Sequence, residues 1–566
     1  MKKNSLLYVK LFLLFLFVGA TINIDFLADR FNTMHDSAYW PIGPFIVFGN
    51  WILCITALLV TSVLPNYYLR VVLTILIIAS TASDAIYQRI SGSEIDYDAL
   101  QILWESRNFA GDAFSFYKGE IHLVILLIVI GAVGLLIPYK ISFNKKNLKI
   151  FSPTILNCYA VSPYIILFVS ILAQGCFSGG LPFQYKTTSL LSILLIDNAL
   201  YGEAQRSVSI PLGKSRFGPT KPHILLIIDE SVRGDYIDIN RNLGVTPHLY
   251  AQRERLTNFG YASSGGNCSL TSNQIIRVGA NPDPEKFDAS LRNNPYIWQY
   301  AKQAGYRTVM IDSQTQKGKM NNRLGKIEVS MLDEFKYVEG ASAQDRDIDA
   351  GRFIKTLLNN KQTQQPYFIV FIKKGIHFPY EERYPKESAK FFPDRKIGDA
   401  LDNVEKLTNS YKNAILWVTD STFADFFDNI TEFSDSIIIY TSDHGQSLLD
   451  QGAKLSHCSQ KDVSPYEGLV PLFVLTDNQQ WKKIFDEAAI KNKNKASHFN
   501  IVPTILDIFG YAVQERVEVH GMSLLDDQLQ KTRRFVSNFI TLNRPSPFSK
   551  KKNKWHTLPD TLRSVE

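Results

Sequence analysis

Residues 436–445 read S-I-I-I-Y-T-S-D-H-G, an apolar run that ends in Asp443, His444 and Gly445. A second run, Ile224–Ile228, leads in the same way into Asp229-Glu230-Ser231. Continuous β-branched runs of this kind are typical of strands buried on both faces of a parallel sheet. Ligands of such sheets bind at the carboxyl ends of the strands, so the two polar ends predict a functional site.

Further runs of the same character lie on both sides of residue 400. Strands are predicted at His223–Ile228, Arg307–Ile311, Tyr367–Ile372, Ser436–Tyr440 and Leu469–Leu475. Polar helical stretches such as Pro295–Ala304 and Asp399–Phe427 separate them. Strands alternating with helices predict an α/β domain with a mostly parallel central sheet, which we place at residues 221–540. Residues 541–566 form a basic, polar tail that we expect to be loosely held from Pro545.

Composition excludes several classes of protein. The chain has 566 residues, of which 45% are hydrophobic and 20% charged, so it is not wholly disordered. Its net charge of +7 is spread over the whole length and does not indicate a nucleic-acid partner. Five cysteines are too few for a disulfide scaffold.

The first third is far more apolar than the rest. Each of its long apolar runs approaches the roughly 20 residues that cross a bilayer. The runs are Leu6–Ile24, Phe45–Leu64, Tyr67–Ser83, Ile121–Tyr139 and Pro153–Gln174. A cleaved signal peptide is the alternative for the first run, and we favour a retained helix because no small-x-small cleavage site follows cleanly. Residues 1–175 are therefore predicted to form a five-span membrane domain.

The positive charges between the spans predict the orientation. With five spans, one side carries Lys2, Lys3, Arg70, Lys140, Lys145, Lys146 and Lys149. This side is cytoplasmic by the positive-inside rule, so everything after Gln174 is exported. Residues 176–220 are predicted to be a connector, in which Ser189–Leu200 forms an amphipathic helix on the membrane surface.

The polar strand ends carry groups suited to metal chemistry. Glu230, Asp443 and His444 offer two carboxylates and an imidazole, a mixed ligand set that suits zinc. The alternative for each acid is a helix N-cap after a strand. A third element, Gly265–Asn273, is a glycine-rich loop leading into a predicted helix at Leu270–Val278. Ser269 at its start is either a cap or a nucleophile that a bound metal ion would activate.

Five motifs in order give the chain a family resemblance. They are I-I-D-E-S-V-R at Ile227–Arg233, G-N-C-S-L-T-S at Gly266–Ser272, H-F-P-Y-E-E-R-Y-P at His377–Pro385, T-S-D-H-G-Q-S-L at Thr441–Leu448 and L-S-H at Leu455–His457. Residues 221–524 resemble the alkaline-phosphatase/sulfatase superfamily. The whole chain resembles the phosphoethanolamine transferases of Gram-negative inner membranes, including the lipid A and mobile colistin-resistance enzymes. The Tyr411-Lys412-Asn413 segment also resembles this family.

The resemblance implies roles for individual residues. Glu230, Ser269, Asp443 and His444 match a zinc site in which Ser269 is the nucleophile, and Thr271 is the competing nucleophile. His377 and His457 match residues that act in catalysis by binding the phosphoryl group or a second zinc ion. Asn267, His377 and His457 are expected to bind substrate. One tightly bound Zn²⁺ is expected, with a second left open.

The resemblance also implies the reaction. Phosphoethanolamine would pass from phosphatidylethanolamine to lipid A or lipopolysaccharide core through a covalent seryl intermediate. The protein would be a monomer in the inner membrane, in contact with lipids, with its catalytic domain in the periplasm and no nucleic-acid partner.

Three departures from the family pattern leave the second metal site and the acceptor open. Ile372 stands where an earlier histidine is common, Gln446 stands where an acid is common, and Ile275 stands where a second cysteine often follows the nucleophile helix. A phosphoglycerol transferase acting on a periplasmic glucan or a teichoic-acid-like polymer is the alternative enzyme. A sulfatase is disfavoured because residues 268–272 lack the Pro and Arg of its formylglycine motif, and a non-catalytic protein is disfavoured because the metal ligands are intact.

Cys268 and Cys458 flank two of the proposed site residues. If Ser269 and His457 contact the same phosphoryl group, the two cysteines are neighbours. A disulfide between them is then an even possibility, because neighbouring side chains also point apart and a bridge needs Cα atoms within about 7 Å.

Overall fold

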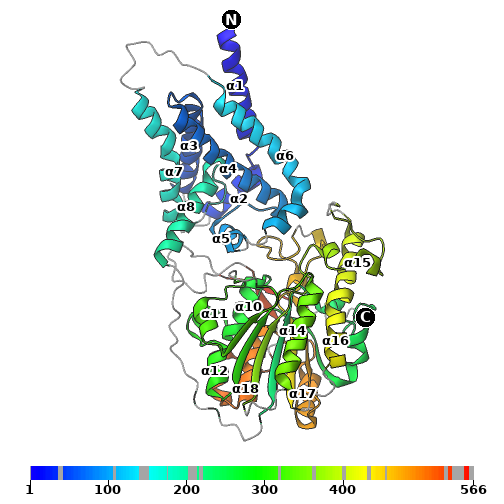
Figure 1. The fold of residues 1–566 in the computed structure, drawn as a ribbon. Helices are drawn as coiled ribbons and strands as arrows, with labels where there is room; N and C mark the ends of the chain where they lie inside the picture. The colour runs from blue at the N-terminus through cyan, green and yellow to red at the C-terminus, as the bar shows by residue number, and fades with distance from the viewer. Residues whose placement is uncertain are drawn as a thin grey trace. The chain divides into compact units, whose positions relative to one another are not determined.

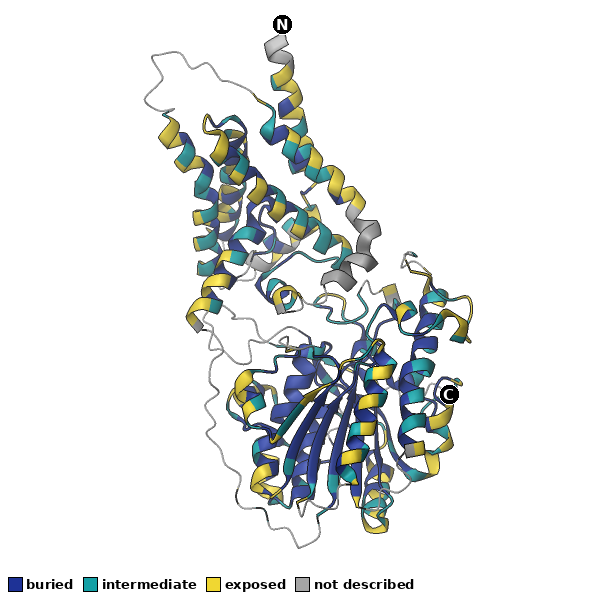
Figure 2. Ribbon diagram, viewed as in Figure 1, coloured by how far each residue is buried: buried dark blue, intermediate teal, exposed yellow. Residues whose placement is uncertain are grey.

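The central strand of the sheet explains the continuous apolar pattern. In the computed structural model, β1 (His223–Asp229) is the fourth of seven strands. Ile224 and Ile228 pack into one core, and Leu225 and Ile227 pack into another on the opposite face. Successive side chains of a strand point to opposite faces, so a strand covered on both sides is apolar throughout. Figure 2 shows these central strands buried along their length.

The structure describes most of the chain. The described residues are 2–35, 42–105, 107, 110–138, 152–174, 176, 178–201, 213, 215, 221–315, 320–359, 365–397, 399, 403–429, 435–452, 455–527, 529, 533–537 and 553–559. They fall into two units, one within Met1–Gly202 and one within Glu203–Asn543 and Asn553–Glu566.

The main sheet is mixed and mostly parallel. Its order is β2-β7-β6-β1-β5-β3-β4. The other strands are β2 (Leu256–Ser263), β3 (Arg307–Asp312), β4 (Glu334–Tyr337), β5 (Tyr367–Ile372), β6 (Ser436–Ser442) and β7 (Leu469–Leu475). β7 is antiparallel to both of its neighbours, and the other pairs are parallel. All five predicted strands are present, and β2 and β4 are additional.

Helices cover both faces of this sheet (Figure 1). Residues of α10, α12 and α18 belong to one core, and residues of α14, α15 and α16 belong to the other. The predicted helix at Asp399–Phe427 begins at Val404 and passes through a π-helical turn, Ile415–Asp420. The helices are α9 (Pro247–Ala251), α10 (Ser269–Val278), α11 (Pro284–Asn293), α12 (Ile297–Gln303), α13 (Lys326–Ser330), α14 (Ala343–Leu358), α15 (Val404–Ala414), α16 (Ser421–Asn429), α17 (Gln479–Asn492), α18 (Ile501–Phe509) and α19 (Val513–His520).

A second sheet corrects the prediction for the tail. β9 (Lys554–Thr557) pairs antiparallel with β8 (Arg534–Ser537), and Leu558 is buried beside it. The expectation of a loosely held tail from Pro545 is therefore wrong for residues 553–559. The three lysines at 550–552 lie outside the described residues.

The described residues of the N-terminal unit form helices and no strands. Its helices are α1 (Lys2–Gly19), α2 (Ile24–His35), α3 (Ile42–Val63), α4 (Tyr67–Ser91), α5 (Tyr97–Glu105), α6 (Ala110–Leu136), α7 (Pro153–Ala173) and α8 (Phe183–Tyr201). Among them α3, α4 and α7 are long and apolar enough to cross a membrane. α1 and α6 contain shorter apolar stretches, Leu6–Gly19 and His122–Leu136, so the count of five spans stays a prediction.

Two buried lysines hold this unit together. The Lys10 ammonium donates to the carbonyls of Leu135 and Ile137 at the end of α6, at 3.3 and 2.9 Å. The first half of α1 and the end of α6 thus lie at the same end of the unit, as five spans would require. Lys186 on α8 pairs with Asp84 on α4 at 3.0 Å, so part of the predicted connector packs within the helical unit. The position of the predicted helix Ser189–Leu200 on a membrane surface stays a prediction.

Candidate active site

Two neighbouring strands bring the predicted metal ligands together. β1 and β6 are parallel, and Asp229 lies opposite Ser442 in their register. The residues that follow, Glu230 on one strand and Asp443 and His444 on the other, therefore leave the sheet side by side. One ligand atom from each lies within 4.8 Å of the others.

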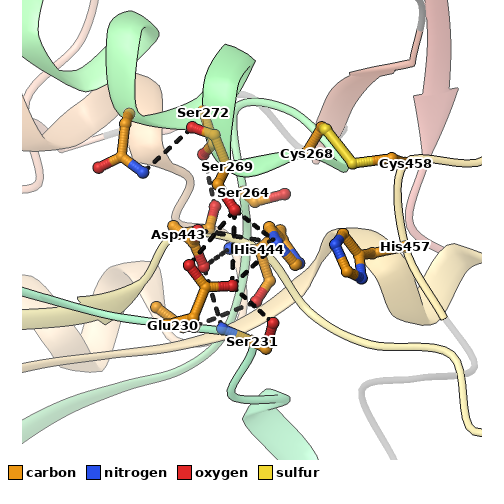
Figure 3. Close-up of polar contacts among 12 residues, drawn as sticks. Glu230, Ser231, Ser264, Cys268, Ser269, Ser272, Asp443, His444, His457 and Cys458 are labelled. Atoms are coloured by element: carbon orange, nitrogen blue, oxygen red, sulfur yellow. Dashed lines mark hydrogen bonds and ion pairs between the residues drawn. A yellow bond between two sulfur atoms is a disulfide. The ribbon is translucent and has the colours of Figure 1, made fainter. Parts of the chain in front are cut away.

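Ser269 completes this cluster from the start of α10. Its Oγ lies 3.1 Å from His444 Nε2 and 3.3 Å from Glu230 Oε2. Figure 3 shows the Ser269 hydroxyl directed at the cluster. Thr271, the competing nucleophile, is buried, and its side chain packs beside Gly266. The first turn of a helix also favours negative charge, which suits a serine oxygen that loses its proton.

The donor set fits a zinc ion. His444 donates from Nδ1 to the Gly445 carbonyl at 2.6 Å, which directs Nε2 to the cluster. Asp443 Oδ2 is buried and makes no hydrogen bond to any described residue. Its Oδ1 accepts from the Ser231 amide at 3.0 Å, which orients the carboxylate. Two carboxylates, one imidazole and one hydroxyl make a four-ligand site with an unsatisfied oxygen directed into it.

Without a metal ion, protons carry the charge balance of the cluster. Burial and the charge of Glu230 raise the pKa of Asp443 to about 7. Burial disfavours the cationic form of His444, but the charges of Asp443 and Glu230 outweigh it and raise the His444 pKa to about 9. Burial also opposes ionisation of Glu230, yet the hydrogen bond and charge of His444 hold its pKa well below the usual value. Strongly shifted pKa values in a buried group of charges mark a candidate functional site.

Three partly exposed side chains lie at the mouth of the cluster. Glu230, Asp443 and His444 are fully buried, whereas Ser269, His377 and His457 are partly exposed. The His457 ring stacks on His444 with centroids 4.5 Å apart and meets the His377 ring edge-on at 5.7 Å. The structure thus brings together all of these predicted residues.

Both histidines at the mouth favour the neutral form. Burial lowers the pKa of His377. Burial, with the charges of His444 and His377, holds the pKa of His457 well below its usual value. A neutral imidazole accepts a proton or a metal ion at a free ring nitrogen.

Asn267 differs from His377 and His457, the other residues predicted to bind substrate, because those two are partly exposed. It is buried, and its amide group donates to the Ser459 carbonyl and to Glu467 Oε2, both at 2.8 Å. These amide hydrogens are therefore used within the protein, and a substrate-binding role for Asn267 stays a prediction.

Of the departures from the family pattern, Ile372 is buried in the core and the Gln446 amide donates to the Tyr380 hydroxyl.

Two glycines are required by close backbone approach. A Cβ on Gly445 would lie 2.1 Å from the Tyr466 carbonyl oxygen. Gly375 has φ +53°, and a Cβ there would lie 2.5 Å from Asp229 Oδ1. Gly445 lets the loop after His444 pass against β7, and Gly375 lets the chain turn from β5 towards His377.

The sequence did not identify several supporting residues. Gln314 donates from its amide to Glu230 Oε2 at 2.9 Å. Lys373 forms a buried ion pair with Asp229 at 2.6 Å. His498 accepts from the Gly265 amide at 3.0 Å through Nδ1 and contacts the Ser272 hydroxyl at the same distance. Gln314 follows the end of β3 and could have been found from the rule on strand ends, whereas His498 carries no such signal.

Tyr411 supports the loop that carries Glu230. Its hydroxyl donates to the Ser231 carbonyl and accepts from the Arg233 amide, both at 2.8 Å. Ser231 has φ +65°, a conformation uncommon for a residue with a side chain, and these hydrogen bonds hold it.

The disulfide between Cys268 and Cys458 is present. Their Cα atoms are 4.7 Å apart and the bond links residues 190 apart in sequence. Figure 3 shows it beside Ser269 and His457. Because Cys268 is held in this bond, it is not a free thiol for conversion to formylglycine.

Comparison with known proteins places the site in a family. The family model described as Sulfatase matches residues 222–511, just over half of the chain. The chain is 26% identical over 312 residues to Kdo(2)-lipid A phosphoethanolamine 7''-transferase of Salmonella typhimurium, covering 51% of this chain and 52% of the relative. That match spans about half the length of the relative. Phosphoethanolamine transferase EptC of Escherichia coli K12 is 22% identical over 497 residues, covering 82% of this chain and 84% of the relative.

A solved structure shares the fold over nearly the whole chain. The integral membrane protein lipooligosaccharide phosphoethanolamine transferase A (EptA) from Neisseria meningitidis superposes with a TM-score of 0.62 at 16% identity. The match covers 91% of this chain and 98% of that one. The arrangement of an N-terminal helical unit followed by the α/β unit is therefore a known fold.

Proposed function

The chain belongs to the sulfatase family, and on this premise we propose that it transfers phosphoethanolamine from phosphatidylethanolamine to lipid A or lipopolysaccharide core. The observation that carries the proposal is the position of Ser269. Its hydroxyl lies at the mouth of a buried carboxylate and imidazole cluster, where a nucleophile meets a substrate from outside. The transferase names of the relatives support the choice of group transferred.

Glu230, Asp443, His444 and Ser269 would hold one zinc ion in this proposal. The ion would lower the pKa of the Ser269 hydroxyl and offset negative charge on the phosphoryl oxygens. Occupancy of a second ion at His377 and His457 is left to metal analysis. The two rings already lie edge to face, with centroids 5.7 Å apart.

The transfer would take place in two displacements. Ser269 Oγ forms a bond to phosphorus, and the bond to the diacylglycerol oxygen breaks, so diacylglycerol leaves with a proton. An acceptor oxygen of the glycolipid then forms a bond to the same phosphorus and releases Ser269. The neutral rings of His377 and His457 would accept and return the protons of these steps.

The helical unit and the disulfide support the location. α3, α4 and α7 provide membrane spans, and both proposed substrates are lipids. A disulfide beside the nucleophile suits an oxidising compartment. We therefore place the protein in the inner membrane with its catalytic unit in the periplasm.

The proposal is tested by following donor and acceptor together. The wild type and Ser269→Ala are produced in a Gram-negative strain that lacks its own phosphoethanolamine transferases. We expect the wild type alone to release diacylglycerol from phosphatidylethanolamine and to add the mass of one phosphoethanolamine to lipopolysaccharide. Consumption of phosphatidylglycerol instead would indicate the phosphoglycerol transferase, and no modification by a folded wild type would refute the proposal.

A further inference from the structure

His457 lies on a segment without regular secondary structure. Residues 455–464 contain neither helix nor strand, and they lead from the loop after β6 to a short 3-10 turn at Pro465–Gly468. The ring contacts His444 and His377, and its Nδ1 lies 3.1 Å from the hydroxyl of the adjacent Ser456. No regular backbone ladder therefore fixes the ring at the site.

Contacts on both sides of His457 hold its backbone. On the N-terminal side, the Ser447 amide donates to the Ser456 carbonyl at 2.6 Å. The Cys458 amide donates to the Asn267 carbonyl at 2.8 Å, and the Asn267 side chain donates to the Ser459 carbonyl at 2.8 Å. Glu467, which is buried, accepts from both the Asn267 side chain at 2.8 Å and the Ser459 amide at 3.1 Å. These hydrogen bonds pair the segment after His457 with the segment before the nucleophile.

The disulfide closes this set of contacts covalently. It joins Cys268, the residue before Ser269 and the N-cap of α10, to Cys458, the residue after His457. Cys458 has φ +59°, a left-handed conformation that is uncommon for a residue with a side chain and that surrounding contacts must hold. The two residues adjacent to the bond, Ser269 and His457, both contact His444.

We propose that the Cys268–Cys458 disulfide is a positioning element that holds His457 against Ser269, so that the rate of transfer depends on the bond being oxidised. This inference rests on the proposed function and adds a requirement to it. Cleavage would leave Ser269 anchored in α10, while His457 would lose its covalent link to the nucleophile. Misplacement of a reacting group by about 1 Å can lower a rate by up to about 100-fold.

The first test measures turnover before and after cleavage of the bond. The purified full chain, supplied with zinc, is assayed for release of diacylglycerol from phosphatidylethanolamine in detergent. Tris(2-carboxyethyl)phosphine reduces the disulfide to two thiols while the phosphine takes oxygen from water and becomes a phosphine oxide. We expect kcat to fall about tenfold or more, with KM changed less than about twofold and the melting temperature still well above the assay temperature.

Three variants separate positioning from other effects of the reductant. Cys268→Ala/Cys458→Ala should have the low kcat of the reduced wild type and should not respond to the phosphine. A response of this variant would show that the reductant acts on the metal ion instead. Cys158→Ala removes an exposed free cysteine and should behave as the wild type does.

The decisive comparison uses His457→Ala. If the disulfide acts through His457, removing the bond in the His457→Ala background should change the residual kcat by less than about twofold. An equal loss of kcat in both backgrounds, or an unchanged kcat after complete reduction of the wild type, would overturn the inference. Failure of the oxidised wild type to turn over would instead refute the proposed function, so the two failures are distinct.

Discussion

Replacement of Lys373 by methionine should strongly destabilise the catalytic unit. The Lys373 ammonium is buried, lies 2.6 Å from Asp229 Oδ2 and is 4.0 Å from Asp347 Oδ2. Methionine has a similar length but no charge, so Asp229 would keep only neutral partners on that oxygen, the hydroxyls of Tyr440 at 2.8 Å and Thr419 at 3.3 Å. Breaking a buried pair from one side costs about 3–5 kcal/mol.

The measurement is urea unfolding of the full chain in detergent, followed by tryptophan fluorescence. Lys483→Met is the matched control, because Lys483 pairs with Glu487 on an exposed helix face at 4.0 Å. Exposed pairs of this kind contribute about 0–1 kcal/mol. The double variant Lys373→Met/Asp229→Asn should recover part of the loss, because the uncompensated charge is removed with its partner. A loss below about 1 kcal/mol for Lys373→Met would refute the reasoning.

Three further changes test the site itself. Ser269→Ala should abolish transfer in a folded protein, while Thr271→Ala should stay active. If transfer assays find Thr271→Ala inactive and Ser269→Ala active, the nucleophile is Thr271. Chelators should inactivate the protein and Zn²⁺ should restore it. Zinc displaces protons from Asp443, whose pKa is raised to about 7, and from His444, whose pKa is raised to about 9. Zinc affinity should therefore fall by about tenfold per pH unit as the pH falls from 9 to 7, and more steeply below pH 7. Competition titrations with a chelator at fixed pH measure this, and an affinity that is constant between pH 6 and 9 contradicts it. Gly445→Ala should prevent folding or lower the melting temperature sharply, because the added Cβ would lie 2.1 Å from a backbone oxygen, and a normal thermal transition would contradict this.

The strands that the sequence predicts most clearly are buried on both faces of the sheet. β1, β5 and β6 are covered on both faces, so they consist of apolar runs that need no tertiary information. β2 reads L-T-N-F-G-Y-A-S and has an irregular register between Asn258 and Tyr261, which interrupts its pattern. β4 is short and lies at the sheet edge, and β9 is a short strand in a basic stretch without an apolar run. Such strands are specified by their neighbours more than by their own residues.

The candidate site divides in the same way. Glu230, Asp443 and His444 follow buried strands, so local pattern marked them as candidates, and the family resemblance implied their shared role. Gln314 also follows a strand end and was within reach of the same rule, whereas His498 supports the site through a contact with the distant Gly265 amide, which no local pattern encodes. The sequence placed Cys268 and Cys458 near one site but did not orient their side chains, so the disulfide did not follow from it.

The pairing of residues 265–267 with Val536 has a consequence for how the chain is made. The Val536 amide donates to the Gly265 carbonyl at 3.0 Å, and the Asn267 amide donates to the Val536 carbonyl at 3.2 Å. Nearby, Arg533 donates to the carbonyl of Tyr261, a residue synthesised 272 positions earlier. At about 5–20 residues per second, the segment before the nucleophile waits roughly 14–54 s for its partner to emerge from the ribosome. During that interval Cys268 follows a loop with unmade backbone hydrogen bonds, and a nascent chain that stops before Arg533 never completes them.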